Sequence, residues 1–363
     1  YKFSSSSDTE VVLKAYDCWG ENCLNKFNGM WSFVIWDNKK KSIFTSNDRF
    51  GVKPLYYYKS TDTIIYSSEI KQFTFFNEID FSINIKNCDL FLNHGYQPLD
   101  KTTYFKSINR FPNGSFLFFN FEDLNNNEWV SFYSIHNIKK NTSCSFNSEI
   151  SKFKYLLTDA ISLRHRSDVE IGISLSGGID STLLLQFSYE IYSKLYDIPL
   201  KLFSAISPQR KGDESHFINE VVKNFNVDSF YVNPFDDFEV NDFNDFIYNL
   251  EFPPTTMSFY AQWLVSRMMR SKGVTINLVG QGADEVFGGY HSHYFRYFRQ
   301  LILKGQIITY ISELNAYSEI REIKKTILHR IVLLDIKTFF MFKIGLKKLD
   351  NKLLNFWNKI NCL

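Results

Sequence analysis

Two different patterns of hydrophobic and polar positions divide the chain. Up to about residue 135, short apolar runs are separated by polar turns, and these runs lie at Trp31–Trp36, Ile43–Ser46, Pro54–Tyr58, Thr63–Tyr66 and Phe116–Phe121. Repeated short strands with turns between them are typical of packed antiparallel sheets. The pattern therefore predicts a partial antiparallel β-sandwich, with one helix over Glu10–Trp19, where apolar residues recur at helical spacing.

From Glu149 onward, strand patterns alternate with helical ones. The predicted buried strands are Val169–Leu175, Leu202–Ile206 and Val274–Val279, and the predicted helices include Thr182–Leu195, Glu214–Phe225, His293–Leu303 and Thr326–Ile336. Such alternation is typical of a doubly wound parallel α/β sheet with helices on both faces. In these sheets, ligands bind at the carboxyl ends of the strands.

The polar stretch Asn125–Ser148 has little periodicity and favours a linker between two domains. We therefore predict a first domain over residues 1–135, a linker over 136–148 and a second domain over 149–363. The fold class expected overall is a mixed α/β and α+β protein that ends in helices.

Charge and cysteine content narrow the functional classes. The chain of 363 residues carries a formal net charge of +2, so no basic field indicates nucleic acid or an anionic membrane. The most apolar region, Ile327–Ile344, is interrupted by charged residues, which argues against a membrane span. The five cysteines are irregularly spaced and form no metal-binding pattern, which favours a reducing, cytoplasmic compartment.

The strongest candidate for chemistry is Ser176–Ser181, which reads Ser-Gly-Gly-Ile-Asp-Ser between a predicted strand and a predicted helix. Glycines allow a tight turn and close approach of a ligand, and N–H groups at a helix start attract anions. Asp180 would repel phosphate unless a cation lay between them, which favours Mg²⁺. A capped turn without a ligand is the alternative interpretation.

A second cluster, Gly280–Tyr290, follows the predicted strand Val274–Val279 and contains four glycines. Its acidic pair, Asp284 and Glu285, would bring carboxylates to a strand end, where one could complete a Mg²⁺ site with Asp180. A helix start with acidic residues in its first turn is the alternative interpretation.

The Ser176–Ser181 loop is similar to the pyrophosphate loop of the ATP pyrophosphatases. Together the two loops resemble the synthetase domain of glutamine-hydrolysing asparagine synthetases, and Arg164–Asp168 and Glu251 match as well. The first half resembles the later part of that family's class-II glutaminase domain at Ser7–Glu10, Phe27–Met30, Asp48–Tyr57, Thr102–Phe105 and Pro112–Gly114. The resemblance covers nearly the whole chain.

The resemblance implies a role for each matching position. It implies that ATP and its pyrophosphate are held by Leu175, Ser176, Gly177, Gly178, Asp180, Ser181, Ile206, Val279 and Gly280. It implies Mg²⁺ binding by Asp180 and Asp284, glutamine binding by Asp8, and a place on the substrate side for Glu251. A helix N-cap is the alternative role of Asp8, and for Arg49 we expect a surface or structural ion pair.

The sequence departs from the family in three respects. The family's glutaminase nucleophile is an N-terminal Cys, whereas this chain starts with Tyr1. We therefore expect that this chain, as given, cannot hydrolyse glutamine. Residues 291–363 also lack the Lys and the Arg-Val-Pro-Phe-like segment that the family carries after the second loop, so we expect a chain that is shortened at both ends. Gln281, our candidate on the catalytic side, stands where many relatives have Glu; glutamine can hydrogen-bond but cannot act as a general base.

The implied reaction joins aspartate and ammonia from glutamine into asparagine through a β-aspartyl-adenylate, releasing AMP and pyrophosphate. Expected partners are aspartate, glutamine or ammonia, and ATP with Mg²⁺, without nucleic acid or membrane; a homodimer is a candidate assembly. Three alternatives stay open. They are a sister enzyme that amidates another carboxylate, such as a sugar acid or peptide, a tRNA-modifying ATP pyrophosphatase, and a non-catalytic ATP-binding relative.

Overall fold

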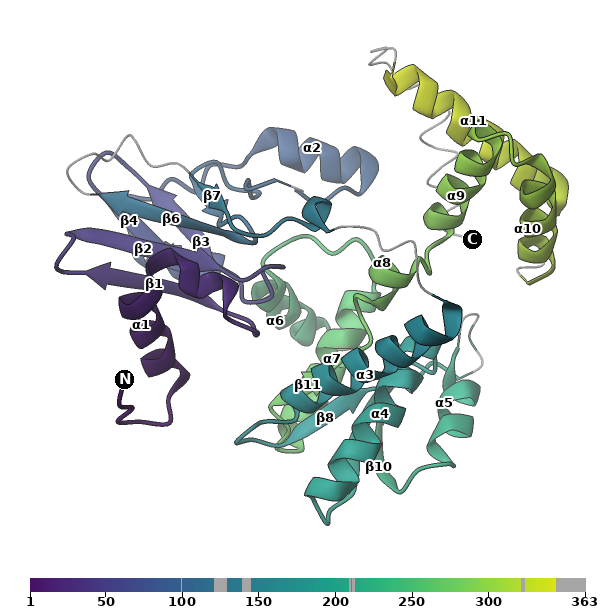
Figure 1. Ribbon diagram of the computed structural model, residues 1–363. Helices are drawn as coiled ribbons and strands as arrows, with labels where there is room; N and C mark the ends of the chain where they lie inside the picture. Colours follow the sequence, from purple (N-terminus) through teal and green to yellow (C-terminus); the bar gives the residue numbers. More distant parts are fainter. Residues whose placement is uncertain are drawn as a thin grey trace. The chain divides into compact units, whose positions relative to one another are not determined.

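A computed structural model describes residues 1–98, 100–120, 129–138, 145–208, 210, 213–320 and 324–343 (Figure 1). The chain forms two compact units. Unit 1 consists of Tyr1–Phe146 and Val240–Thr256, and unit 2 consists of Asn147–Glu239 and Met257–Leu363. A segment from the second half of the sequence therefore belongs to the first unit.

Unit 1 is built mainly from strands. They are β1 (Ser32–Asp37), β2 (Ser42–Asn47), β3 (Tyr56–Lys59), β4 (Ile64–Ser67), β5 (Ile108–Arg110), β6 (Ser115–Asn120) and β7 (Val130–Ser131). Its helices are α1 (Asp8–Trp19), α2 (Ile85–His94) and α6 (Val240–Leu250), with the 3₁₀ turns η1 (Gly20–Asn25), η2 (Ile70–Phe75) and η3 (Ile135–Asn137). Side chains start two of these helices: Ser7 accepts the N–H of Thr9 before α1, and Asn84 accepts that of Asn87 before α2.

The strands of unit 1 form two antiparallel sheets, in the orders β1-β2-β6-β7 and β4-β3-β5. Phe44 of β2 is fully buried in a cluster with Tyr16 of α1, so this helix covers one face of the first sheet. Leu117 of β6 packs in a separate cluster with Tyr57 of β3, which joins the two sheets. Each large apolar side chain buried in this way stabilises the fold by about 1.5–3 kcal/mol.

Unit 2 contains the parallel sheet and most of the helices. Its strands are β8 (Ile171–Ser174), β9 (Leu200–Ala205), β10 (Val227–Val232) and β11 (Ile276–Leu278). The helices are α3 (Phe146–Arg164), α4 (Ile179–Leu195), α5 (Ser215–Val222), α7 (Ser258–Ser271), α8 (Ala283–Phe287), α9 (His291–Leu303), α10 (Ile307–Ile320) and α11 (Lys325–Lys343).

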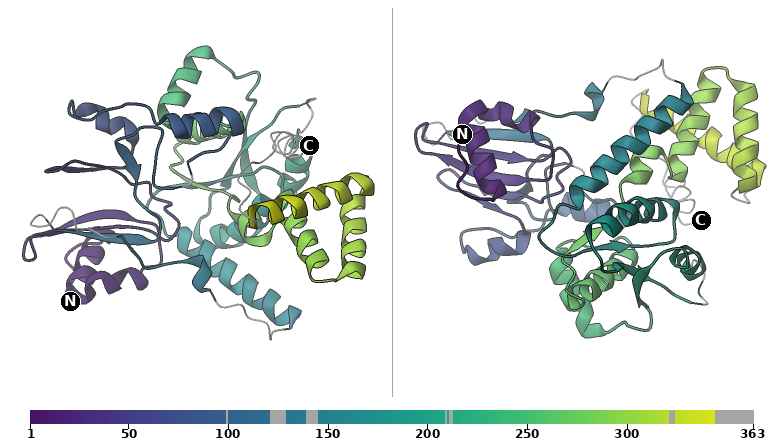
Figure 2. Two further views of the ribbon diagram at one scale, coloured as in Figure 1. Left: turned by 90° about the horizontal axis from the view of Figure 1, so that it is seen from above. Right: turned by 60° about the horizontal axis from the view of Figure 1, so that its bottom comes forward.

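The four strands of unit 2 pair in parallel in the order β10-β9-β8-β11. Neighbouring residues of β9 point to opposite faces of this sheet. Leu202 packs with Leu185 of α4 and Ile218 of α5, whereas Phe203 packs with Met269 of α7. Helices therefore cover both faces, and the turned views in Figure 2 show the strands between them.

The last three helices, α9, α10 and α11, pack on one another around their own core. Asp335 of α11 is buried there and accepts a hydrogen bond from the Arg299 guanidinium of α9 at 2.8 Å. Asp335 is one of the charges that interrupt the most apolar stretch of the sequence, and its partner explains how that charge is accommodated. Among the helices that the structure describes, none combines the length and hydropathy of a transmembrane segment.

The structure confirms antiparallel sheets in the first half and a parallel sheet with helices in the second. Helix α4 starts at Ile179, earlier than the predicted Thr182, so Asp180 and Ser181 are helical. The patterns missed α2, α6, α10, β5, β7 and β10. Helix α6 was missed because its Asn and Asp residues have a low intrinsic helix preference. Tertiary packing stabilises the helix in spite of this preference.

The polar stretch Asn125–Ser148 is more regular than predicted. Its described part contains β7, η3 and the start of α3, while residues 125–128 and 139–144 lie outside the described residues. Strand β7 forms because its backbone pairs with β6. Backbone pairing leaves no trace in the pattern of hydrophobic and polar residues, so this strand could not be predicted from it. The domain limits at residues 135 and 148 stay a prediction.

Candidate functional site

The Ser176 loop joins β8 to α4 at the carboxyl edge of the parallel sheet. Leu175 still belongs to the ladder, since its N–H donates to the carbonyl of Phe203 at 2.9 Å. The Ser176 and Ser181 hydroxyls lie 3.1 Å apart, and Ser181 Oγ accepts the Ser176 N–H at 3.2 Å. These bonds fold the loop back onto the first turn of α4.

The start of α4 presents backbone N–H groups that have no partner in the described part of the chain. The first internal bond of the helix runs from the N–H of Thr182 to the carbonyl of Gly178 at 3.1 Å. No side chain caps the helix at Gly178. The N–H groups of Ile179–Ser181 therefore lie at the N-terminus of α4, which is the positive end of the helix dipole. This arrangement suits the binding of an anion.

Gly177 shows why this loop needs glycine. Its φ is +80°, a conformation that side chains disfavour, and a Cβ there would lie 3.0 Å from Phe217 Cβ and 3.2 Å from the Ile218 nitrogen of α5. The loop backbone is thus held against a neighbouring helix. Glycine is the residue that combines this dihedral angle with so close an approach.

The second glycine loop lies against the same helix start. A Cβ placed on Gly280 would lie 2.9 Å from the Ser181 nitrogen and 3.1 Å from the Asp180 carbonyl carbon. Both are backbone atoms of α4, so they cannot move aside without shifting the helix. The two motifs predicted to act together are therefore in direct contact.

Replacing Gly280 by alanine is expected to push the loops apart, because the added methyl meets backbone on α4. We expect a loss of about 1–3 kcal/mol in unfolding free energy from overpacking, and weaker binding of ATP. Chemical denaturation and nucleotide titration measure the two effects. Gly29→Ala is the matched control, since a Cβ there meets nothing within 4 Å. Wild-type nucleotide affinity in Gly280→Ala would contradict the assigned contact.

Three carboxylates gather beside the loop. Burial, followed by the charges of Asp284 and Glu285, raises the pKa of Asp180. The Tyr290 hydroxyl donates to Glu285 Oε1 at 2.8 Å, and this bond, with burial and the same acidic charges, raises the pKa of Tyr290 to about 12. The structure thus brings Asp180 and Asp284 into one electrostatic neighbourhood, and it adds Tyr290, to which the sequence assigned no role.

The site fits a divalent cation by its electrostatics. No lysine or arginine within the described ranges pairs with Asp180, Asp284 or Glu285, and their mutual repulsion is what a cation would relieve. Carboxylate oxygens are also the ligands that Mg²⁺ prefers. No group of three or more His, Cys, Asp or Glu side chains is close enough to form a complete metal cage in this part of the chain. The donor set therefore suits an ion that also binds phosphate oxygens.

The residues predicted to line the base and ribose pocket lie at the same sheet edge. Leu175 is buried in the core, Ile206 is half-buried against it, and Val279 precedes Gly280 after β11. Their contact with nucleotide stays a prediction. Gln281 is exposed, and its amide donates to Gln262 Oε1 of α7 at 3.3 Å.

Asp8 belongs to unit 1 and lies in the first turn of α1. The N-cap is Ser7, so the alternative role of Asp8 as N-cap is wrong. The reason is local: the Ser7 hydroxyl, one residue earlier, already accepts the N–H of Thr9 at 3.2 Å. The Asp8 carboxylate is exposed and accepts only the Thr9 hydroxyl, at 3.5 Å, among the described residues. A role in glutamine binding stays a prediction.

The loop after β2 is organised by a residue to which the sequence assigned no role. Asp48 is 2 % exposed, and its carboxylate accepts N–H groups from Trp31, Phe50, Val52 and Lys53 at 3.0 to 3.3 Å. The cue was available, because an Asp before a turn often binds backbone amides.

Arg49, next to Asp48, has a structural role of another kind than the expected ion pair. Its guanidinium donates to the Phe27 carbonyl at 2.8 Å and lies over the rings of Trp31 and Tyr133. Among the described residues it pairs with no carboxylate. The prediction of an ion pair was therefore wrong, because the guanidinium contacts a backbone carbonyl and two aromatic rings instead of a carboxylate.

Glu251, matched to the family on the substrate side, belongs to unit 1. Its carboxylate accepts the backbone N–H groups of Ile70 and Lys71 at 2.9 and 2.7 Å. A place beside the substrate stays a prediction. What the structure shows is a carboxylate engaged at both oxygens by unit 1 itself.

Comparison with known proteins identifies two regions of the chain. Residues 1–130 match the glutamine amidotransferase domain, and residues 152–339 match the asparagine synthase family. A Methanocaldococcus jannaschii protein, provisionally named asparagine synthetase [glutamine-hydrolyzing] 2, is 35% identical over 83% of this chain and 57% of its own length. Asparagine synthetase [glutamine-hydrolyzing] 3 of Bacillus subtilis is 26% identical over 80% of this chain and 48% of its own.

A third relative carries a different name. Amidase chyE of Penicillium rubens is 24% identical over 80% of this chain and 44% of its own length. The chain thus spans about half the length of the curated relatives it matches. The two family matches, together with the paired glycine loops at the edge of a parallel sheet, show that the chain belongs to the asparagine synthase family, preceded by a glutamine amidotransferase domain.

Proposed function

We propose that the protein forms an amide at the expense of ATP, with aspartate as the carboxylate, ammonia from glutamine as the nitrogen source, and asparagine, AMP and pyrophosphate as products. The observation that carries this proposal is the Ser176 loop, whose fixed shape leaves the N–H groups of Ile179–Ser181 without protein partners in the described chain. Such groups stabilise the charge on a departing pyrophosphate because they are oriented before the reaction starts.

The reaction needs two displacements. An oxygen of the aspartate side-chain carboxylate bonds to the α-phosphorus, and the bond from that phosphorus to the bridging oxygen breaks, so pyrophosphate leaves with the electron pair. The nitrogen of ammonia then bonds to the acyl carbon, AMP leaves, and the nitrogen gives up a proton. Water must be excluded between the two displacements, because it would hydrolyse the acyl-adenylate.

Asp180 and Asp284 are the residues that would hold Mg²⁺, with Glu285 beside them. The ion would supply positive charge at the phosphate oxygens. The chain's own contribution is the amide-lined loop, the close packing of Gly280 on α4, and the bond from Tyr290 that orients Glu285.

Finer features of the architecture belong to the same proposal. The cluster that joins Leu117 and Tyr57 supports a two-layer β-sandwich in unit 1, and the clusters on both faces of β9 support a doubly wound sheet in unit 2. A cytoplasmic location and a homodimer stay predictions.

A second candidate is amidation of a carboxylate other than aspartate. Gln281 favours it, because an exposed neutral amide bonded to Gln262 stands in the second loop, and a neutral side chain does not discriminate between acceptors by charge as a glutamate there would. The similarity to an enzyme named as an amidase supports the same candidate.

Carboxylate-dependent exchange of pyrophosphate into ATP tests the proposal, with Mg²⁺, the full chain, and a panel containing aspartate, sugar acids and peptide carboxylates. We expect exchange with aspartate and little with the rest. Exchange with another carboxylate would replace aspartate by the second candidate. Failure to exchange with any member, together with no binding of ATP and Mg²⁺ by calorimetry, would overturn both and leave a non-catalytic relative.

A further inference from the structure

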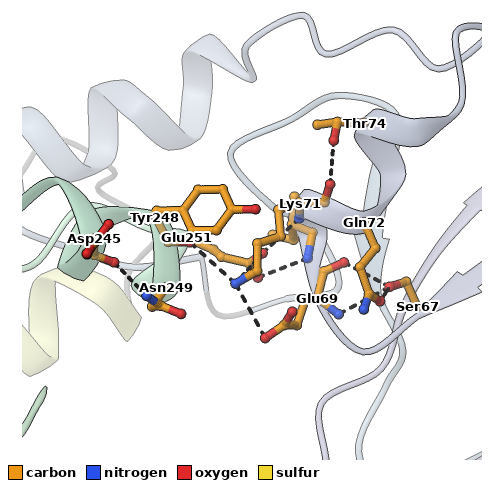
Figure 3. Close-up of polar contacts among 10 residues, drawn as sticks. Ser67, Glu69, Lys71, Gln72, Thr74, Asp245, Tyr248, Asn249 and Glu251 are labelled. Carbon is orange, nitrogen blue, oxygen red and sulfur yellow. Dashed lines mark hydrogen bonds and ion pairs between the residues drawn. The ribbon is translucent and has the colours of Figure 1, made fainter. Parts of the chain in front are cut away.

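The turn η2 in unit 1 is capped by a residue that lies far away in the sequence. Figure 3 shows the Glu251 side chain reaching the start of η2, where its Oε2 accepts the Ile70 N–H at 2.9 Å and its Oε1 accepts the Lys71 N–H at 2.7 Å. The first N–H groups of a helical turn have no carbonyl partner within the turn, so a carboxylate that accepts them is favourable. The Glu251 side chain is 12% exposed, which strengthens these charge-assisted bonds.

Further contacts hold the same segment. Lys71 Nζ lies 3.8 Å from Glu251 Oε1, approaches the Tyr248 carbonyl at 3.5 Å and lies over the Tyr248 ring (Figure 3). The Gln97 amide donates to the Pro253 carbonyl at 2.9 Å. Within unit 1, the end of α6 and the loop after it are therefore bonded to the N-terminal part of the chain on both sides of Glu251, although this segment lies inside the region matched to the asparagine synthase family.

The backbone at Glu251 points to the same conclusion. Its φ is +62°, and among the described residues only Lys41 shares a positive φ without being glycine. A residue with a side chain is strained in this conformation. The two bonds to η2 offset this cost, which explains why a glutamate rather than glycine can occupy the position.

We propose that Glu251 is a positioning residue: by capping η2 it fixes the chain between α6 and α7 for binding of the acceptor carboxylate. The chain runs from this loop directly into α7, the helix that carries Gln262, the partner of Gln281 in the second glycine loop. The proposal rests on the proposed function only for the identity of the bound carboxylate. The cap itself stands on the contacts described above.

Glu251→Gln tests the proposal in the full chain. Glutamine keeps the length of the side chain but turns one acceptor into a donor that faces an N–H group. We expect amide hydrogen exchange at Ile70, Lys71 and the first turn of α7 to become faster by about tenfold. In carboxylate-dependent pyrophosphate exchange we expect the KM for the acceptor to rise by about tenfold, with the rate at saturating acceptor changed by less than about twofold.

Two further variants make the result decisive. Glu251→Gly removes the carboxylate and also the cost of the positive φ, so it folds and is expected to show the same faster exchange and raised KM. Glu69→Gln is the control, because it removes a charge 3.4 Å from Lys71 Nζ and none of the cap bonds; it should match the wild type.

Unchanged amide exchange at Ile70 and Lys71, or faster exchange there with an unaltered α7 and an unaltered KM, would overturn the positioning role. If the wild-type chain supports no carboxylate-dependent exchange at all, the proposed function fails. The amide exchange of η2 and α7 then decides the positioning role by itself.

Discussion

Replacing Asp180 by asparagine is expected to lower carboxylate-dependent pyrophosphate exchange by about a thousandfold, since the site loses a carboxylate for charge stabilisation at the phosphates. The folded chain should nevertheless become more stable. Burial and the charges of Asp284 and Glu285 raise the pKa of Asp180, so its ionised form is unfavourable in the folded state. A neutral side chain of equal size removes that repulsion.

The pH dependence of this gain has a definite sign. The pKa of Asp180 lies above its ordinary value of 3.8 in the folded chain. Just above pH 3.8 the folded state therefore binds more protons than the unfolded state, and the unfolding free energy falls as pH rises through that window. The advantage of Asp180→Asn should be complete at neutral pH and absent below pH 3.8. Urea denaturation at several pH values measures it.

Magnesium provides the second readout for Asp180. Adding Mg²⁺ with ATP should raise the melting temperature of the wild type and leave that of Asp180→Asn nearly unchanged, because binding stabilises only a state with a site. Asp228→Asn, on the exposed side of β10, is the control and should behave as the wild type in both assays. Full exchange activity in Asp180→Asn, or an equal shift with Mg²⁺, would rule out Asp180 as part of the site.

Replacing Asp48 by alanine is expected to destabilise the chain by about 3 kcal/mol. Four backbone N–H groups lose their acceptor, and an N–H left without any partner costs about 1–3 kcal/mol. Phe50, Val52 and Lys53 are exposed residues, so water replaces part of the lost bonds and the total stays below the full sum. For a unit of this size the melting temperature should fall by about 6–12 °C. The melting temperature of Asp48→Asn should lie between those of the wild type and Asp48→Ala. The amide keeps one oxygen that can accept hydrogen bonds, but its NH₂ group would face backbone N–H donors.

The matched control for Asp48 is Asp62→Ala. Asp62 also accepts local hydrogen bonds, from the hydroxyls of Ser60 and Thr63, but it is exposed, so water can replace it. We expect a change within about 0.5 kcal/mol. Equal melting temperatures for Asp48→Ala and Asp62→Ala would show that the amides around Asp48 find other partners.

The sequence by itself determined the elements whose signals are local. Val169–Leu175 followed by Ser176–Ser181 predicts a strand, an anion-binding turn and a helix, because glycines at a strand end, hydroxyls and a helix start all act within a few residues. β8, the loop and α4 confirm this order. The alternation of strands and helices from Glu149 likewise predicted a parallel sheet, since burial on both faces leaves nearly continuous apolar runs.

The tertiary structure alone decided which distant groups meet. Asp180 and Asp284 share one electrostatic neighbourhood because β8 and β11 pair in parallel and bring their carboxyl ends to the same edge. Asp48 accepts hydrogen bonds from backbone N–H groups on both sides of its loop. Glu251, which lies in the region matched to asparagine synthase, caps η2 in unit 1. Hydrophobic periodicity reports which face of an element is buried, but not the partner that buries it, so these contacts could not be predicted from the chain alone.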